Sequence, residues 1–165
     1  MHPWKEQGMM TTEPNAPELR ISQWIGPHGE TLDTPVTLAN LGDGVKILFA
    51  FQDWCTGCHS HGFPTLQRLY SALEPRGVGF AAIQTVFEGP EANTSDKLRV
   101  NQTRYRLPIP FGHDEPPEGS SLPTFMQDYH THGTPWFTVI DAEGKLVYSG
   151  FQLDAERLAT AILQE

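Results

Sequence analysis

Residues 45–58 read VKILFAFQDWCTGC, and this stretch decides the fold. Its first half, residues 45–51, is a nearly continuous apolar run, which is typical of a central β-strand covered on both faces. The run leads into two cysteines separated by two residues, Cys55 and Cys58. Beyond them, apolar residues recur at helical spacing, and residues 79–87 form a second apolar run. The pattern predicts a strand, a helix and a parallel strand joined by a right-handed crossover.

The remaining segments predict a single α/β domain. Upstream, we expect a flexible, proline-containing tail over residues 1–18, followed by one domain over residues 19–165. That domain should begin with a short strand at residues 20–25, followed by a second short strand or a turn at residues 36–41. Downstream, the patterns predict a helix ending near residue 105, a strand at 109–112, a short helix at 122–129, a hairpin of 136–141 and 145–148, and a final helix capped by Asp154.

Composition and charge exclude several classes of function. A chain of 165 residues can bury a core without a disulfide or a structural metal. Its net charge of −9 argues against binding to nucleic acid or to an anionic membrane surface. The longest apolar run, residues 47–51, is far shorter than the roughly 20 residues of a membrane span. We expect a monomer without membrane insertion, cytoplasmic as written, or periplasmic or secreted if an export signal was trimmed.

The two cysteines have the spacing and the position of a redox pair. Cys55 falls at the amino end of the predicted helix, where unpaired backbone N–H groups and the helix dipole stabilise a thiolate. Cys58, one turn later, can reach back to resolve a mixed disulfide. We therefore predict that Cys55 is the nucleophile and Cys58 the resolving thiol. Half of a zinc site and an inert buried pair are the alternatives.

Two further motifs extend this pattern into a resemblance. Phe63 and Pro64 lie in the helix after the cysteines, and Gly133, Thr134 and Pro135 precede the predicted hairpin. The chain thus resembles the thioredoxin-like superfamily over about residues 20–165, and within it the TlpA/ResA-like thiol-disulfide oxidoreductases, which overlap with the AhpC/TSA redoxin group. The resemblance implies an α/β fold with a central mixed sheet of four family strands flanked by helices. It also implies an N-terminal hairpin extension and an insertion after the second family strand, at residues 88–106.

The resemblance also implies the remainder of the site. The peptide bond between Thr134 and Pro135 would be cis and would face the cysteines, and the backbone at Thr134 would pair with an extended substrate chain. Trp54 would be an apolar shield beside the sulfurs and part of the docking surface. No cofactor is implied. The partners would be protein thiols or disulfides and an upstream electron donor, and the motif does not fix the direction of electron flow.

The sequence departs from the family at two places. Phe49 stands where thioredoxin has a buried aspartate, six residues before the first cysteine. In the family pattern C-x-x-C-x-x-E-x-P, the glutamate position is His61 here, and the proline is displaced by one residue to Pro64. Histidine titrates near neutral pH, so His61 could accept the proton of Cys58. An exposed histidine on the helix surface is the alternative.

Two other functions are compatible with these residues. His59, His61, His130 and His132 lie near the two motifs, and imidazole with thiolate suits copper or zinc. A metallochaperone-like domain that uses the cysteines with His132 or His59 is therefore the alternative function, and a histidine cluster without function is the simpler explanation. A peroxiredoxin-like peroxide reductase is third. Its P-x-x-x-[TS]-x-x-C motif fails here, because Leu48 and Gln52 occupy the required positions before Cys55.

Overall fold

The computed structural model describes residues 13–164, so most of the expected tail, residues 1–12, lies outside the described part. The chain forms an open, mixed six-stranded sheet with the strand order β1-β4-β3-β2-β5-β6. β2 is parallel to β3, and β3 to β4, whereas the other pairs are antiparallel. The strands are β1 (Gln23–Ile25), β2 (Lys46–Phe51), β3 (Gly79–Thr85), β4 (Phe111–Asp114), β5 (Trp136–Ile140) and β6 (Leu146–Gly150). This architecture confirms the predicted thioredoxin-like α/β fold.

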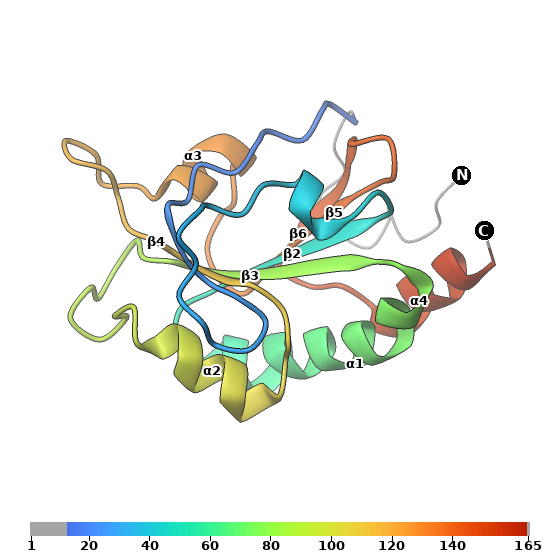
Figure 1. Ribbon diagram of the computed structural model, residues 1–165, viewed down its shortest axis with the longest axis horizontal. Helices are drawn as coiled ribbons and strands as arrows, with labels where there is room; N and C mark the ends of the chain where they lie inside the picture. The colour runs from blue at the N-terminus through green and yellow to red at the C-terminus, as the bar shows by residue number, and fades with distance from the viewer. Residues whose placement is uncertain (1–12, 165) are drawn as a thin grey trace.

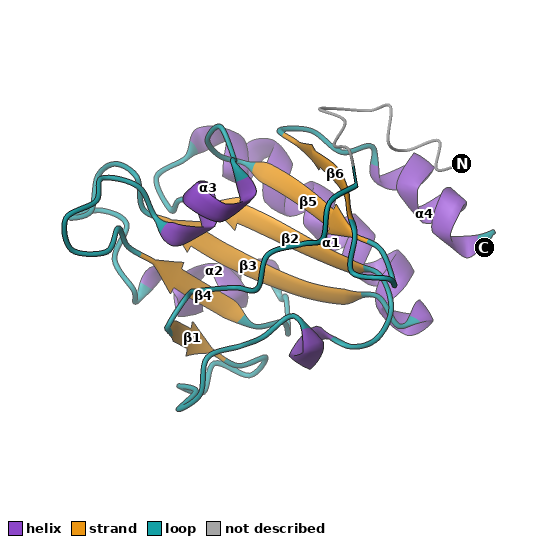
Figure 2. Cartoon of the chain, turned by 90° about the horizontal axis from the view of Figure 1, so that it is seen from above, coloured by secondary structure: helices purple, strands orange, loops and turns teal. Residues whose placement is uncertain are grey.

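Helices cover both faces of the sheet (Figures 1 and 2). One face carries α1 (Phe63–Leu73), α2 (Lys97–Tyr105) and α4 (Ala155–Leu163), and the other carries α3 (Thr124–Tyr129). Short 3₁₀ turns occupy Ala39–Leu41 and Glu74–Arg76, and a π-turn spans Cys58–Gly62. The described helices are all too short and too polar to cross a membrane.

The central strand β2 explains why its sequence is apolar without alternation. Ile47, Phe49 and Phe51 belong to the core under α1, whereas Leu48 and Ala50 belong to the core under α3. All five side chains are fully buried, as expected for a strand covered on both faces. The strand therefore ends in the interior of the molecule, and the chain emerges from it at the cysteine pair.

The N-terminal region differs from the expectation in two ways. The predicted hairpin extension is reduced to a single bridge between Ile25 and Thr31, because β1 pairs instead with β4 at the edge of the sheet. The end of the expected tail is attached to the sheet. The amide of Leu146, at the start of β6, donates to the carbonyl of Pro14 at 2.8 Å, and Asn15 bridges Lys145.

Strand β4 begins two residues later than the sequence predicted, because it contains two buried polar side chains that are satisfied by partners. Asp114 accepts hydrogen bonds from the backbone amides of Thr124 (3.3 Å) and Phe125 (2.7 Å), at the start of α3. His113 lies against Gln84 of β3 at 3.2 Å. Burial raises the pKa of Asp114, and these hydrogen bonds oppose that shift.

Candidate active site

Cys55 caps the helix that follows β2. Its amide donates to the carbonyl of Gln52 at 3.1 Å, and helical structure begins at the next residue. The amide of Cys58 donates to the Cys55 carbonyl and also to the Cys55 sulfur, both at 3.1 Å. The sulfur of Cys55 thus takes the place of the oxygen of an N-cap residue, and it satisfies a backbone donor that the helix start leaves free.

The two thiols are free and have different surroundings. Cys55 is partly exposed, and its pKa is lowered from 9.0 to about 6, chiefly by the hydrogen bond from the Cys58 side chain. The Thr134 side chain, the Cys58 amide and the charge of His59 act in the same direction, and desolvation opposes them. Cys58 is fully buried, and its pKa is raised, first by desolvation and then by Cys55. Near neutral pH this arrangement favours a Cys55 thiolate beside a Cys58 thiol.

Pro135 packs directly against the helix that carries the cysteines. The Thr134-Pro135 peptide bond is cis, the geometry that the resemblance implied. A Cβ added to Gly57 would lie 3.5 Å from Pro135 Cδ, and one added to Gly62 would lie 2.9 Å from Pro135 Cβ. The Thr134 side chain lowers the pKa of both thiols. The structure therefore brings Cys55, Cys58, Thr134 and Pro135 together.

Trp54 is the largest exposed hydrophobic side chain beside the cysteines, with 49% of its surface accessible. Its backbone amide donates to Asn93 Oδ1 at 3.1 Å. Its indole lies over Gly89, where an added Cβ would approach Trp54 Cη2 to 2.5 Å. Gly89 also has a φ of 55°, so both the backbone and the space require glycine. The segment after β3 thus packs against one face of the Trp54 ring, and the rest of the ring stays accessible to solvent.

A π-turn accounts for the displaced proline. The amide of Phe63 donates to the carbonyl of Cys58, five residues earlier, and closes a turn that is one residue wider than an α-turn. The extra residue is absorbed there, so that α1 continues in register with Pro64 in its first turn. Counted back from that proline, the glutamate position of the family pattern corresponds to Gly62, not to His61.

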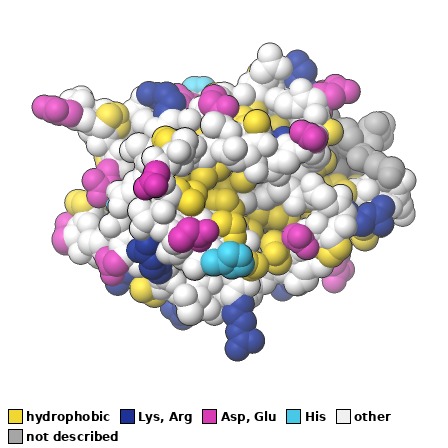
Figure 3. All heavy atoms as spheres, in the orientation of Figure 1, with side chains coloured by type: hydrophobic (Ala, Val, Ile, Leu, Met, Phe, Trp, Pro, Cys, Tyr) yellow, Lys and Arg dark blue, Asp and Glu magenta, His cyan; other side chains and the backbone are white. Residues whose placement is uncertain are grey.

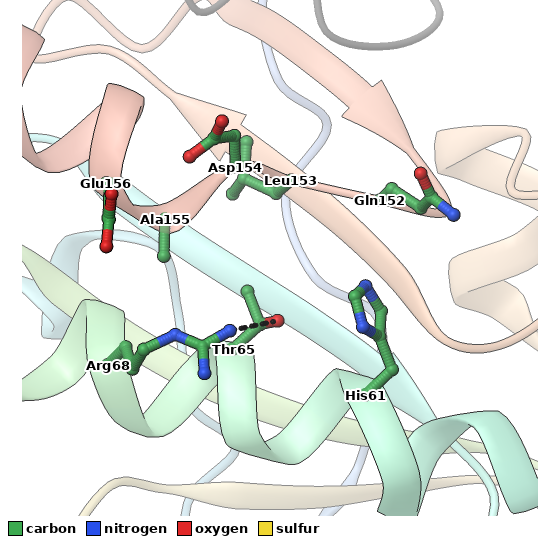
Figure 4. A pocket seen from close by; sticks show the side chains of 8 residues that line it. All are labelled: His61, Thr65, Arg68, Gln152, Leu153, Asp154, Ala155 and Glu156. Carbon is green, nitrogen blue, oxygen red and sulfur yellow. Dashed lines mark hydrogen bonds between the residues drawn. The ribbon is translucent and has the colours of Figure 1, made fainter.

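His61 is exposed and lies on the side of the helix that faces α4. It lines a cavity of about 540 Å³ together with residues of α1 and of the start of α4 (Figure 4): Thr65, Arg68, Gln152, Leu153, Asp154, Ala155 and Glu156. The side-chain interactions that shift the pKa of Cys58 come from Cys55 and Thr134. An acid–base role of His61 on Cys58 stays a prediction.

His59 and His132, the other histidines considered as metal ligands, have different partners in the fold. His59 Nε2 lies 2.6 Å from the carbonyl oxygen of Asp53, and His59 Nδ1 lies 2.5 Å from the hydroxyl of Tyr105. His132 is exposed, and its ring contacts Trp136 at 5.1 Å. Within residues 13–164, no three or more His, Cys, Asp or Glu side chains are placed to hold a metal ion together.

Sequence reasoning missed the polar residues that hold residues 53–55 in place. Asn101 Nδ2 donates to Asp53 Oδ1 at 3.0 Å, and Lys97 Nζ lies 3.5 Å from Asp53 Oδ2. The amide of Asp53 donates to Gln84 Oε1 at 2.9 Å. Asn93 and Asn101 are fully buried. No sequence signal could have connected them to the cysteines, because the contacts span 31 to 48 residues.

Comparison with solved structures places the chain in a family. A protein of the thioredoxin-like superfamily is 35% identical and superposes with a TM-score of 0.77, over 94% of this chain and 95% of that one. The chain belongs to the thioredoxin-like superfamily. A thiol-disulfide isomerase from Corynebacterium glutamicum is 27% identical, with a TM-score of 0.74 over 92% of this chain and 98% of that one.

More distant members of the superfamily share the fold. One is a putative thiol:disulfide interchange protein DsbE from Chlorobium tepidum, 18% identical with a TM-score of 0.65, over 94% of this chain and 98% of that one. No protein-family model and no curated protein matches the chain. The chain shares its fold and superfamily with proteins named thiol-disulfide isomerases, and it is an oxidoreductase enzyme.

Proposed function

We propose that the chain exchanges a dithiol for a disulfide with a protein partner, with Cys55 as the nucleophile and Cys58 as the resolving thiol. The observation that carries the proposal is the difference between the two sulfurs. Cys55 is accessible, has a pKa of about 6 and accepts the Cys58 amide at 3.1 Å, whereas Cys58 is buried and protonated. A thiolate is the attacking species in such exchange, and at neutral pH only Cys55 supplies one.

The reaction proceeds in two displacements. The Cys55 thiolate attacks one sulfur of the partner's disulfide, breaks the S–S bond and expels the other sulfur as a thiolate, which takes a proton from water. Cys58 then attacks Cys55 in the mixed disulfide, breaks the bond to the partner, and its proton passes to the second partner sulfur, which leaves as a thiol. The partner gains two electrons, and this chain is left with a Cys55–Cys58 disulfide that an external thiol donor must reduce. The same steps in reverse oxidise a partner dithiol.

Trp54, Thr134 and Pro135 form the proposed docking surface. Thr134 and Pro135 lie against the helix that begins at Cys55, and Trp54 presents an apolar face next to it. An extended segment of the partner can add to the backbone at Thr134 as a strand, which would bring its disulfide to Cys55. The monomeric state, the upstream electron donor and the compartment, which is cytoplasmic as written or else periplasmic or secreted, are predictions that belong with this proposal.

The test is a trapping experiment with Cys58→Ser. Without the resolving thiol, Cys55 should retain partners as mixed disulfides that a reductant releases. Cys55→Ser/Cys58→Ser is the matched control and should retain none. The proposal fails if Cys58→Ser, with a Cys55 that alkylates normally, exchanges with no protein disulfide in a lysate or in purified model substrates.

A further inference from the structure

We propose that His59 and Tyr105 form a positioning pair that holds residues 53–55 against α2 and thereby sets the reactivity of Cys55. The inference rests on the proposed role of Cys55 as the nucleophile. Neither the spacing of the cysteines nor the resemblance assigns a role to Tyr105, which ends α2 at position 105, far from the motif in sequence.

The hydrogen bonds of His59 define its orientation. The carbonyl of Asp53 can only accept, so His59 Nε2 carries a hydrogen and donates to it at 2.6 Å. With the neutral ring, His59 Nδ1 then accepts from the Tyr105 hydroxyl at 2.5 Å. One imidazole therefore connects the residue two positions before the nucleophile to the end of α2.

Ring packing fixes the same pair from the sides. The rings of Phe63 and Tyr105 stack at 4.2 Å with an interplanar angle of 7°, and the His59 ring stacks against each of them at 5.8 Å. The carbonyl of Tyr105 accepts from Gln67 of α1 at 2.8 Å. The imidazole thus has little freedom to turn, which is the condition for a side chain that positions another group.

The charged and titratable groups around the pair complete the arrangement. Cys55 and Cys58 lie on the same helix as His59, and Asp53 precedes them, with its carboxylate held by Lys97 and Asn101 of α2. The guanidinium of Arg104 lies 5.4 Å from the centre of the Tyr105 ring. A protonated His59 also lowers the pKa of Cys55 through its charge, whereas the neutral ring acts only through its hydrogen bonds to Asp53 and Tyr105. His59 is a positioning residue, since its ring nitrogens contact Asp53 and Tyr105 and not the sulfur.

The test measures how fast iodoacetamide alkylates Cys55 in the reduced full chain. Mass spectrometry follows the reaction at pH values between 4 and 9. In His59→Gln the midpoint of the pH profile should rise by about half to one pH unit, and the rate at pH 6 should fall about twofold to fivefold. Tyr105→Phe keeps the ring stacking and loses only the hydroxyl, so it should shift the profile in the same direction by less. The double variant should differ little from His59→Gln alone, because both substitutions break one network.

Controls separate the possible failures. His28→Gln and Tyr70→Phe replace an exposed histidine and a partly buried tyrosine outside the site and should keep the wild-type profile. A fall in thermal stability with an unchanged midpoint would make the pair merely structural and overturn the inference, as would fully additive effects of the two substitutions. If His59→Gln does not fold, Tyr105→Phe decides alone. A wild-type Cys55 that does not react would instead contradict the proposed function.

Discussion

At the scale of single residues, the sulfur of Cys55 lies at the surface of the site, whereas that of Cys58 is enclosed by the core beneath α1. Hydrogen bonds from Cys58 and Thr134 stabilise the negative charge on the first sulfur, and burial penalises a charge on the second. The sequence predicted the low pKa of Cys55 from the helix N-terminus. The largest contribution is instead the hydrogen bond from the neighbouring thiol, which only the folded geometry reveals.

This difference predicts a specific pH dependence of stability for the reduced protein. The pKa of Cys55 is 9.0 in its ordinary state and about 6 when folded, so between these values the unfolded chain binds more protons. The unfolding free energy should therefore rise as the pH increases from 6 to 9, and this contribution should be lost as the pH falls through 6. Urea unfolding of reduced wild type and of Cys55→Ser across this range measures it. Parallel pH curves for the two proteins would contradict the prediction.

At the scale of elements, the π-turn and the cis-proline loop meet at Gly62. An added Cβ there would lie 2.8 Å from Phe49 Cζ and 2.9 Å from Pro135 Cβ, closer than packed carbon atoms allow. The helical φ of −61° would accept alanine, so space alone excludes a side chain. Phe49 occupies the position of thioredoxin's buried aspartate, and here it fills the core between Gly62, Phe63 and Phe137.

We expect Gly62→Ala to lower the unfolding free energy by about 1–3 kcal/mol, because Phe49 or Pro135 must move. Gly57→Ala is the matched control. Gly57 is also helical, with a φ of −64°, and its added Cβ would meet Pro135 at an ordinary 3.5 Å. It should be neutral or stabilising by up to about 1 kcal/mol. Denaturant unfolding compares the two, and equal effects would show that the contact with Gly62 is not restrictive.

The elements that the sequence predicted are those with a strong local pattern. The apolar runs of β2 and β3 and the cap of α4 at Asp154, whose side chain accepts from the Arg157 amide at 3.1 Å, were all identified. The start of β4 was not, because its polar residues find partners only in the folded chain. The contact between His59 and Tyr105 was missed for the same reason, because the two residues lie 46 positions apart in the sequence. The π-turn was missed although its hydrogen bond is local, because the spacing of apolar residues does not distinguish one wider turn within a helix.

At the scale of the whole molecule, two cores lie on opposite faces of one sheet, beneath an acidic surface. In the view of Figure 3, acidic side chains are spread over the face and hydrophobic ones gather near its centre. The core under α1 is completed by α4, whose Leu158 is fully buried. The C-terminal helix thus contributes to the same core as the helix that carries the cysteines.

Leu158→Ala should therefore lower the unfolding free energy by about 2–4 kcal/mol, through lost burial and the cavity left behind. Leu163 is on the same helix with 41% of its surface exposed, and Leu163→Ala should cost less than about 1 kcal/mol. Urea unfolding of both variants measures the difference. A similar loss in both would mean that α4 contributes through its helicity and not through the packing of Leu158.

The attachment of residues 14–16 to the start of β6 has a consequence for association between copies. A sheet edge offers unpaired amides and carbonyls to any second strand, which makes long free edges prone to aggregation. Here one outer strand, β1, is only three residues long, and the other begins beneath Pro14, Asn15 and Ala16. A neighbouring copy therefore meets a very short strand at one edge and a strand whose start is already paired at the other, whereas the loop at Thr134 would bring an incoming chain to the cysteines.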